Sequence, residues 1–415
     1  MRLKGFEKLT QIDEALRIYF DVVKPKSLGG VDISIHEALG RVTAKDIIAE
    51  KDLPPFNRSA VDGYAVKAED TTNTSQSNLK ILQLTQKTTI TKNHAKPVWT
   101  GNPLPNGADA VIMLEHVKHL DNNIEISVQI TPGENVSRRG EDIQKGQVAV
   151  KSGTRLKPQH LGLLAALGKI AISVVEQPKI AILSTGNELV ELGKKPDANQ
   201  IVDVNRLVLS SMCRELGAEP VDLGIARDDE NKISARIRQG LEKAHIVITS
   251  GGTSTGKADL VPVAIDKLGK PGVIVHGVAM RPGMPTALAV LQYKPLVVLS
   301  GNPVAAMIGF EVFVRPLVLA LLGVKDESRP VLKAKLTRRV AGALGRRVFL
   351  RVLVSQKDDQ FFAEPVRVTG SGILSTMTKA NGYVVIPENR EGLEEGETVL
   401  VSLFDKVKTE ETKDV

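Results

Sequence analysis

The sequence contains a single cysteine, Cys213, and few aromatic residues: one Trp, four Tyr and nine Phe among 415 residues. One cysteine excludes an internal disulfide and a zinc site built from cysteines. The scarcity of aromatic rings leaves Val, Ile, Leu and Ala to form the core. The chain has no H-E-x-x-H motif and no Walker A motif, and its seven histidines show no metal-binding spacing. The sequence therefore gives no sign of a zinc metalloprotease or a P-loop nucleotide-binding site.

Long apolar runs are also absent, since no run approaches the roughly 18 apolar residues of a membrane span. The segment Met1–Thr10 is charged and has no apolar stretch typical of a secretory signal. We therefore expect a cytoplasmic protein without a membrane partner. The formal net charge of +7 suits an anionic small molecule. It would also suit nucleic acid, but no basic run or aromatic platform supports that alternative.

From Pro178 onward, apolar strands and amphipathic helices alternate with short connections, which favours a parallel sheet covered on both faces. A linker at 326–330 precedes a region of short β segments, and residues 66–138 also have a β pattern. The expected strands of the α/β region are Lys179–Leu183, Pro220–Ile225, His245–Thr249, Gly272–Val278, Ala287–Leu291 and Leu296–Leu299, and its helices are Val204–Leu216, Asn231–Ala244, Leu260–Leu268 and Val304–Leu322.

Polar and glycine-rich clusters follow the strands of this α/β region. In an open α/β sheet, ligands bind beyond the carboxyl ends of the strands. If the sheet is parallel, most of the clusters gather at one edge, and we expect a ligand site there. The clusters are 184–188 (STGNE), 227–229 (RDD), 250–256 (SGGTSTG) with Asp259, 281–285 (RPGMP) and 300–303 (SGNP).

Each cluster has a chemical use. The glycines of 250–256 permit close approach of backbone N–H groups to a phosphate or another oxyanion. Three carboxylates at one edge, Glu188, Asp228 and Asp259, repel each other unless a cation such as Mg²⁺ lies between them. Arg281 could pair with an oxyanion. Taken singly, these features are more often turns, helix caps or solvated charges; their joint occurrence favours a site.

At these loops the sequence becomes recognisable. The motifs together resemble the molybdopterin molybdenumtransferase family, which includes bacterial MoeA and the E domain of gephyrin. The resemblance covers nearly the whole chain in the family's order, and it rests on STGNEL (184–189), DVNR (203–206), RDD (227–229), SGGTSTGKAD (250–259), MRPGMP (280–285), SGNPVAA (300–306), PPFNRSAVDGYA (54–65), TGNPLPNGADAVI (100–112), RRGEDI (138–143) and RVTGSGILSTMTKANGYVVIP (367–387).

The resemblance implies a multidomain α/β plus β fold. Its centre is a doubly wound, mostly parallel α/β sheet of the molybdopterin-binding type, at 178–325. The resemblance further implies a mixed N-terminal α+β domain (1–50 and 141–177) carrying a β-rich insert (51–140), a C-terminal β domain (326–404) and a tail (405–415). It also implies an elongated homodimer, and a molybdopterin adenylyltransferase is a candidate partner.

The implied reaction inserts molybdate, or tungstate, into the dithiolene of adenylylated molybdopterin with release of AMP, and it requires Mg²⁺ or a similar cation. Glu188, Asp228 and Asp259 match the family's acidic residues around the cation. Asp62 and Asp142 match acidic positions that the homodimer brings to the site. Substrate contacts are expected from Thr100, Thr185, Ser250, Gly251, Gly252, Ser254, Gly256, Pro282, Gly301, Asn302 and Pro303, and molybdate contacts from Arg281, Arg351 and Ser371.

The chain departs from the family pattern in one loop, where many members have lysine at the positions of Arg281 and Met284. The partners of the oxyanion are therefore an open point. Two other activities stay open as alternatives: adenylylation of molybdopterin, and a non-catalytic scaffold like gephyrin. The sister adenylyltransferase lacks the extra domains, and a scaffold gains fused domains that are not seen here, so both rank below the transferase.

Overall fold

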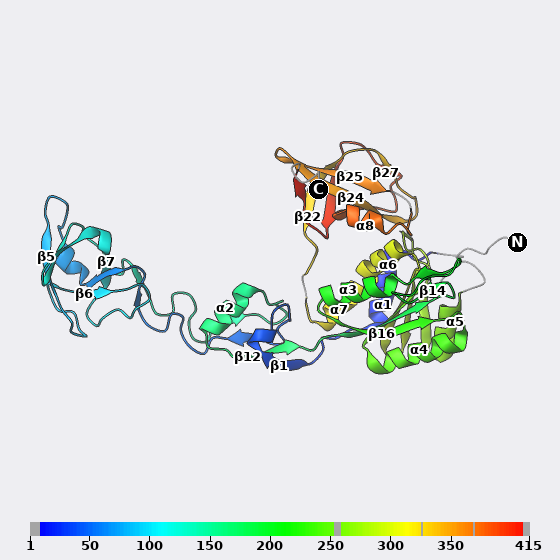
Figure 1. Ribbon diagram of the computed structural model, residues 1–415, viewed down its shortest axis with the longest axis horizontal. Coiled ribbons are helices and arrows are strands. Elements are labelled where there is room, and N and C mark those ends of the chain that lie inside the picture. The colour runs from blue at the N-terminus through cyan, green and yellow to red at the C-terminus, as the bar shows by residue number, and fades with distance from the viewer. Residues whose placement is uncertain (1–8, 253–258, 325–326, 368–369, 410–415) are drawn as a thin grey trace. The chain divides into compact units, whose positions relative to one another are not determined.

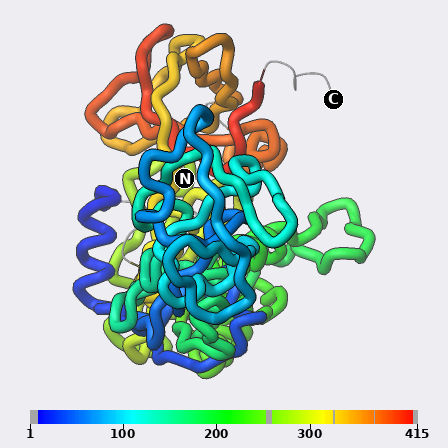
Figure 2. The backbone as a smooth tube through the Cα atoms, turned by 90° about the vertical axis from the view of Figure 1, so that its left-hand side faces the viewer, coloured from blue at the N-terminus to red at the C-terminus, as the bar shows by residue number. Residues whose placement is uncertain are grey.

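The computed structural model describes residues 9–252, 259–324, 327–367 and 370–409 (Figure 1). The chain forms two compact units. A smaller unit contains residues 30–174, and a larger unit contains residues 1–29 together with 175–415. The chain thus leaves the larger unit after its first helix and returns to it at Val175. This course, from blue at the N-terminus to red at the C-terminus, can be followed in the backbone trace of Figure 2.

The larger unit is built on a six-stranded sheet with the order β16-β13-β17-β21-β20-β18. The pairings β16–β13, β13–β17 and β17–β21 are parallel, whereas β20 is antiparallel to both of its neighbours. Strand β18 therefore runs in the same direction as the four parallel strands. The sheet comprises β13 (Lys179–Thr185), β16 (Glu219–Ala226), β17 (Ile246–Ser250), β18 (Pro271–His276), β20 (Ala287–Leu291) and β21 (Lys294–Leu299).

Strand β20 is the reversed strand of a sheet that the resemblance implied to be mostly parallel. It is joined to β21 by a tight hairpin in which Gln292 and Tyr293 both have positive φ, at 52° and 61°. Two consecutive left-handed residues are typical of the hairpin turn whose twist matches that of the flanking strands. Such a short connection permits only antiparallel pairing, because a parallel pair needs a long crossover.

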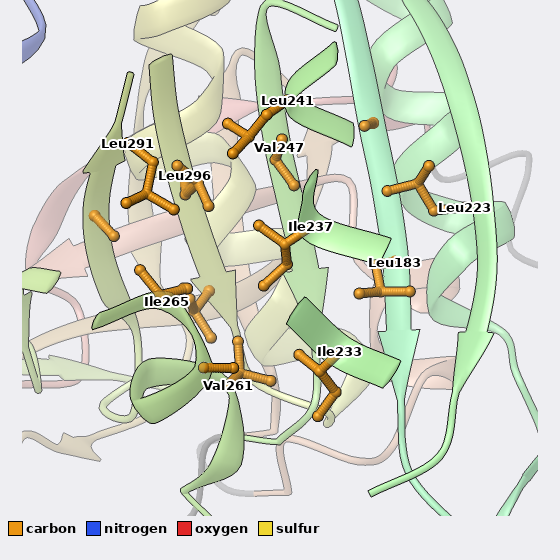
Figure 3. Packing of buried hydrophobic residues seen from close by; sticks show 14 of the residues in the cluster. Leu183, Leu223, Ile233, Ile237, Leu241, Val247, Val261, Ile265, Leu291 and Leu296 are labelled. Atoms are coloured by element: carbon orange, nitrogen blue, oxygen red, sulfur yellow. The ribbon is translucent and has the colours of Figure 1, made fainter. Parts of the chain in front are cut away.

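Helices cover both faces of the sheet. Alternate residues of a strand point to opposite faces, and in β13 Ile180 and Ile182 are as fully buried as Ala181 and Leu183. Figure 3 shows one of these cores, in which α4 (Glu230–Lys243) and α5 (Leu260–Leu268) pack Leu and Ile side chains against the strands. The other helices beside this sheet are α1 (Ile12–Val23), α3 (Asn205–Glu215), and a continuous stretch made of α6 (Pro303–Gly309), the π-helix η4 (Phe310–Val314) and α7 (Arg315–Leu321).

The stretch Pro303–Leu321 is, among the described residues, the one helix long and apolar enough to cross a membrane by length and composition alone. Its apolar side chains are packed inside the larger unit, where Phe310, Phe313, Leu317 and Val318 are fully buried. A core helix of a globular protein passes the same test of composition, and this packing accounts for the apolar character of the segment.

The C-terminal part of the larger unit is a closed ring of strands in the order β24-β25-β22-β28-β26, because β26 pairs back onto β24. Below it is called the barrel. A short strand, β19 (Met280–Arg281), lies beside β24 in parallel pairing and thereby joins the loop after β18 to the barrel. The barrel comprises β22 (Val331–Leu336), β24 (Arg347–Lys357), β25 (Gln360–Arg367), β26 (Gly382–Ile386) and β28 (Thr398–Leu403), with a short helix α8 (Ser375–Lys379) before β26.

The smaller unit has a six-stranded sheet in the order β7-β4-β6-β5-β9-β8 and several two-stranded pairs. One apolar cluster lies within residues 64–130 and a separate one within residues 35–174, outside that sheet. Two cores support an inserted domain, and we propose 51–140 as its bounds. The elements are β1 (Gly30–Ser34), β2 (Ile47–Ile48), β3 (Arg58–Ser59), β4 (Gly63–Val66), β5 (Lys80–Leu84), β6 (His94–Val98), β7 (Ala110–Met113), β8 (Val117–Leu120), β9 (Asn123–Ile126), β10 (Val136–Ser137), β11 (Val148–Val150), α2 (Pro158–Ala166) and β12 (Ala171–Val175).

Candidate functional site

The carboxyl ends of five strands of the large sheet, β13, β16, β17, β18 and β21, emerge at one edge, because these strands run in the same direction. A cavity of about 580 Å³ opens there, and below it is called the first cavity. Six of the residues predicted to form the site line it: Thr185, Glu188, Ser250, Gly301, Asn302 and Pro303. Segments far apart in the sequence therefore meet as the strand-end argument expects.

Two glycines fix the loop after β17 against the end of β13. Gly251 and Gly252 have φ values of 91° and 65°, a region that side chains with a Cβ rarely adopt. A Cβ on Gly251 would lie 2.4 Å from the carbonyl oxygen of Thr185, and one on Gly252 would lie 2.7 Å from its hydroxyl. Close approach of the two loops thus depends on both glycines. The predicted contacts Ser254 and Gly256 lie outside the described residues.

A hydrogen-bonded network joins three of the segments that line the first cavity. Asn205, at the start of α3, donates from Nδ2 to the Ser250 hydroxyl at 2.7 Å and to the Gly301 carbonyl at 2.8 Å. The Ser250 hydroxyl in turn donates to the carbonyl oxygen of Ser300 at 3.3 Å. Sequence reasoning noted Asn205 only as a letter of the DVNR motif. A lone asparagine at a helix start gives no signal of this bridging position, which depends on the packing of three loops.

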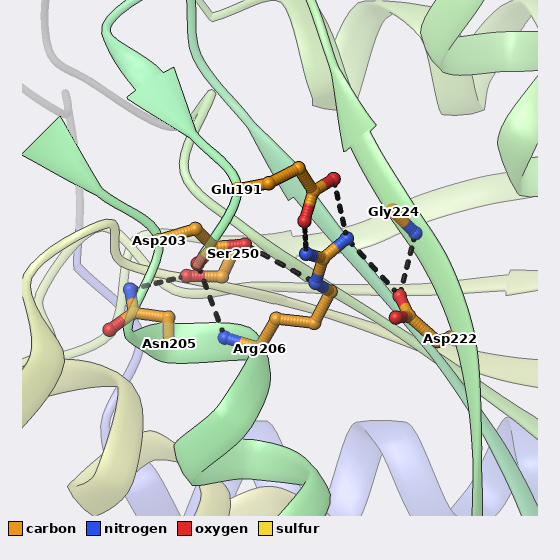
Figure 4. A network of polar contacts seen from close by, with 7 residues as sticks. All are labelled: Glu191, Asp203, Asn205, Arg206, Asp222, Gly224 and Ser250. Atoms are coloured by element: carbon orange, nitrogen blue, oxygen red, sulfur yellow. Dashed lines mark hydrogen bonds and ion pairs between the residues drawn. The ribbon is translucent and has the colours of Figure 1, made fainter. Parts of the chain in front are cut away.

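Arg206, the next residue, anchors the neighbouring ribbon formed by β14 (Leu189–Val190) and β15 (Ile201–Val202). Its guanidinium pairs with Glu191 and lies 3.4 Å from Asp203 and 3.3 Å from Asp222 (Figure 4). Burial opposes the charge of this guanidinium, but the hydrogen bond to Glu191 and the nearby carboxylates outweigh it and raise the pKa of Arg206. The ribbon forms one wall of the first cavity through Leu189, Ile201 and Val202.

A second cavity of about 340 Å³ adjoins the first, and Met284, Pro285, Ser300 and Asn302 line both. The structure brings Arg281, Pro282, Arg351 and Ser371 together in this second cavity, although they come from the α/β domain and the barrel. The backbone N–H of Val304 donates to the carbonyl of Ser371 at 3.0 Å and holds the two domains together there. Arg346 also lines this cavity and was not predicted, because nothing in its local sequence distinguishes it from other surface arginines.

Arg351 is the largest buried side chain of the chain's described part, with 2% of its surface exposed. It lies on β24 and donates from Nη2 to the carbonyl of Arg367 at 3.2 Å. Burial, followed by the positive charge of Arg367, lowers the pKa of the Arg351 guanidinium. A buried cation of this kind gains stability from an anion beside it. The second cavity is therefore suited to a small oxyanion.

The predicted metal ligands Glu188, Asp228 and Asp259 are not assembled into one set. Among the described residues, no group of three or more His, Cys, Asp or Glu side chains is placed to hold a metal ion. Asp228 accepts from the backbone N–H of Asn187 and donates its own N–H to the Asn187 side chain, both at 3.2 Å. Asp259 lies 3.5 Å from the His276 ring. Asp228 and Asp259 each have a local partner, so the protein alone does not form the expected cation site.

Three further predicted residues, Asp62, Thr100 and Asp142, lie in the smaller unit. The backbone N–H and the hydroxyl of Thr100 both donate to Asp62 Oδ1 at 2.7 Å. These hydrogen bonds lower the pKa of the Asp62 carboxyl. Asp142 is exposed on a turn whose backbone N–H bonds the carbonyl of Leu53. The structure thus pairs Asp62 with Thr100, and the function of all three residues stays a prediction.

Comparisons with known proteins agree with this architecture. Three family models match consecutive parts of the chain: "MoeA N-terminal region (domain I and II)" over residues 10–168, "Probable molybdopterin binding domain" over 181–320 and "MoeA C-terminal region (domain IV)" over 333–404. A molybdopterin biosynthesis protein of Methanocaldococcus jannaschii is 38% identical, with 97% of this chain and 98% of that protein aligned. The molybdopterin molybdenumtransferase of Haemophilus influenzae is 34% identical, over 90% and 93% of the two chains.

Solved structures support the same assignment. A crystal structure of the molybdopterin biosynthesis MoeA protein from Pyrococcus horikoshii matches with a TM-score of 0.79 and 37% identity. A second structure of a MoeA protein from this organism has a TM-score of 0.82 and 31% identity. Each match covers 96% of this chain and the whole of the other. The resemblance expected from the motifs is confirmed, and the chain belongs to the molybdopterin molybdenumtransferase, or MoeA, family.

Proposed function

We propose that this protein inserts molybdate into adenylylated molybdopterin and releases AMP, as a step in molybdenum cofactor biosynthesis. The observation that carries the proposal is the pair of adjoining cavities. The first is lined by hydroxyl, amide and backbone groups at the strand ends together with Glu188 and Asp203, and the second by Arg281, Arg346 and Arg351. The two cavities share a wall, so an oxyanion held in the second would lie next to a substrate held in the first.

The charges fit the two reactants of this reaction. Molybdate is a dianion, and the adenylylated substrate carries phosphates and thiolates. Like charges repel strongly in a partly desolvated site, and fixed cations lower the cost of bringing them together. Guanidinium groups are well matched to tetrahedral oxyanions, because they present several N–H donors in a fixed plane. Three arginines around one small cavity therefore support molybdate as the second reactant, and tungstate has the same charge and shape.

The Mg²⁺ requirement is a separate part of the proposal. The carboxylates do not form a ligand set without substrate, and Mg²⁺ commonly binds through one or two carboxylates together with phosphate oxygens. We therefore expect no Mg²⁺ binding to the protein alone and binding only when the adenylylated substrate is present. Isothermal titration of Mg²⁺ with and without substrate tests this expectation. Tight binding without substrate would contradict it.

The remaining family properties are also proposed for this chain. We propose a cytoplasmic homodimer in which Asp62, Thr100 and Asp142 contribute to the site, and which takes its substrate from a molybdopterin adenylyltransferase. Light scattering of the purified protein measures the dimer directly. Mixing variants tests the shared site. Asp62→Asn protein and Arg351→Ala protein should each have little activity at a low molybdate concentration and should regain activity together if each site draws on two subunits.

The reaction itself is tested by two assays with purified protein. In the first, adenylylated molybdopterin is supplied and AMP is measured before and after molybdate is added; we expect AMP to appear only after the addition. In the second, molybdopterin and ATP are supplied, and ATP consumption would instead indicate the adenylyltransferase alternative. A protein that is folded and inactive in both assays would contradict the proposal and favour the scaffold alternative.

A further inference from the structure

Buried polar atoms without a partner lie along the first cavity. The hydroxyl oxygens of Ser184 and Thr185 and Oδ1 of Asn205 find no hydrogen-bond partner among the described residues. Their side chains are only 1%, 2% and 7% exposed, and all three line this cavity. Native proteins leave few buried polar groups unsatisfied, because each forfeits its hydrogen bonds to water. Three such atoms around one cavity mark the place of a ligand.

The orientation of the Asn205 amide is fixed by its two known contacts. The Gly301 carbonyl can only accept, so the group that faces it at 2.8 Å must be the Nδ2 amide NH₂. The Ser250 hydroxyl gives its own hydrogen to Ser300 and is free to accept the second NH₂ hydrogen. Both NH₂ hydrogens are then used. The carbonyl oxygen Oδ1 is left as an acceptor, and Figure 4 shows it pointing away from the Ser250 hydroxyl.

A lone acceptor selects for a particular ligand chemistry. A carbonyl-type oxygen binds an N–H or O–H donor and repels phosphate, whose oxygens are acceptors with negative charge. The neighbouring hydroxyls of Ser184 and Thr185 can donate or accept, so they suit a ring edge that mixes donors and acceptors. The arginines are confined to the second cavity, and the unsatisfied acceptor to the first. The two cavities thus separate recognition of an oxyanion from recognition of an uncharged ring.

We propose that Asn205 is a specificity-determining residue whose Oδ1 accepts a hydrogen bond from an N–H group of the fused nitrogen heterocycle of the substrate. Ser184 and Thr185 bind the adjacent ring edge, and Ser250 and Gly301 hold the amide in position. This inference rests on the proposed function, and it goes further by naming the recognising atom. The adenine and the pterin of the adenylylated substrate both carry such N–H groups, so the test distinguishes them.

The test measures affinities of two probes, AMP and a soluble pterin carboxylate, by isothermal titration with wild type, Asn205→Leu and Asn205→Gln. Leucine removes the acceptor at similar volume, and we expect about ten- to hundredfold weaker binding of the probe that Asn205 recognises. Glutamine keeps both the amide hydrogens and the carbonyl acceptor on a longer side chain, so its loss should be smaller. A phosphate at this position would bind Asn205→Leu at least as tightly as wild type, because leucine removes an acceptor that repels it; that result overturns the proposal.

A matched ligand pair strengthens the result. If AMP is the affected probe, purine riboside monophosphate, which lacks the amino group, should bind wild type and Asn205→Leu equally. If the pterin is affected and AMP is not, the pterin end occupies this place. Equal affinities of wild type and Asn205→Leu for both AMP and the pterin would overturn the proposal.

Folding is controlled in two ways. Ser210→Ala changes another buried residue of α3 that does not line the cavity, and it should leave both affinities unchanged. Ser250→Ala removes one anchor of the amide without touching the acceptor, and we expect a smaller loss for the same probe.

The AMP-release assay is run in parallel. A wild type that binds the probes as expected and releases no AMP contradicts the proposed function alone, whereas an active wild type with an indifferent Asn205→Leu contradicts only this inference.

Discussion

The two adjoining cavities of the larger unit have four lining residues in common and differ in chemistry. The first is formed at the strand ends of one sheet and presents hydroxyl, amide and backbone groups together with the carboxylates of Glu188 and Asp203. The second lies between that sheet's loops and the barrel and presents three arginines. The difference follows from where each wall originates. Glycine-rich strand ends permit close approach of backbone, whereas the barrel provides Arg346 and Arg351, of which Arg351 is held in place by burial.

This separation has a chemical advantage. If the arginines surrounded the whole site, they would hold the phosphates and the oxyanion equally well, with no preference for either position. With the cations confined to one cavity, an oxyanion is directed to a place beside the substrate. The comparison predicts that substitutions in one cavity change the binding of one reactant and leave the other largely unaffected.

The largest effect is expected for Arg351→Ala. This guanidinium is buried in the second cavity, and a charge-assisted hydrogen bond to an oxyanion in such a place is strong. We expect the KM for molybdate to rise by about a hundredfold while the KM for the adenylylated substrate stays within about twofold. Steady-state AMP release at varied concentrations of each reactant measures both values.

Two further variants control this experiment. Arg351→Lys keeps the charge and loses the planar donor set, so its molybdate KM should lie between those of wild type and Arg351→Ala. Arg339→Ala removes an exposed barrel arginine that pairs with Glu394, and it should change neither KM. A folded Arg351→Ala protein with an unchanged molybdate KM would contradict the assignment of molybdate to the second cavity.

A smaller effect, on binding of the adenylylated substrate and not of molybdate, is expected for Gly252→Ala in the loop beside the first cavity. The new Cβ would lie 2.5 Å from the Val261 side chain and 2.7 Å from the Thr185 hydroxyl, at a φ of 65°. The loop must shift, and we expect about tenfold weaker binding of the adenylylated substrate. The molybdate KM should not change, since no described residue of this loop lines the second cavity.

Gly193→Ala is the matched control for backbone strain. Gly193 also has a positive φ, at 88°, but a Cβ there meets nothing within 4 Å. This variant should lose about 1 kcal/mol of stability and keep both KM values. If it weakened substrate binding as much as Gly252→Ala, the close contact between the loops would not be the cause.

The position of the site could be predicted from the sequence, because it depends on strand direction. Apolar segments such as KIAIL and HIVIT identify buried strands, and strands joined by helices must run in the same direction, so their following loops share an edge. The reversal of β20 could not be predicted in this way. Its sequence, ALAVL, is as apolar as a buried parallel strand, and only the two-residue hairpin after it decides its direction.

Contacts between segments far apart in the sequence were harder to predict. Arg346 reaches the second cavity next to a pairing of Met280 with Arg347, which no local pattern reveals. The predicted cation set did not form for a different reason. A shared edge places Glu188, Asp228 and Asp259 in the same region, but Asn187 and His276 engage two of them, and side-chain partners within a loop are not encoded in strand direction.

The smallest effect is expected for Arg347→Gln, which loosens the barrel without removing a cavity residue. Arg347 donates to Asp13 of α1 at 2.8 and 2.9 Å and to Glu388 of the barrel at 3.1 Å. These pairs are partly exposed, and the β19–β24 pairing and the bond from Val304 to Ser371 remain in the variant. We therefore expect the molybdate KM to rise only about two- to fivefold, with substrate binding unchanged.

The same variant gives a pH dependence of known sign. The hydrogen bonds from Arg347 lower the pKa values of Asp13 and Glu388. A carboxyl with a lowered folded pKa stabilises the protein above its unfolded pKa of about 4, and this contribution is lost as the pH falls through the folded value. The difference in melting temperature between wild type and Arg347→Gln should thus shrink as the pH is lowered from 6 to about 3.

Arg390→Gln, which breaks the pair with Glu397 elsewhere on the barrel, should show the same shrinking difference with no change in the molybdate KM. If it raised that KM as much as Arg347→Gln, general loosening of the barrel, and not its attachment to α1, would set the geometry of the second cavity.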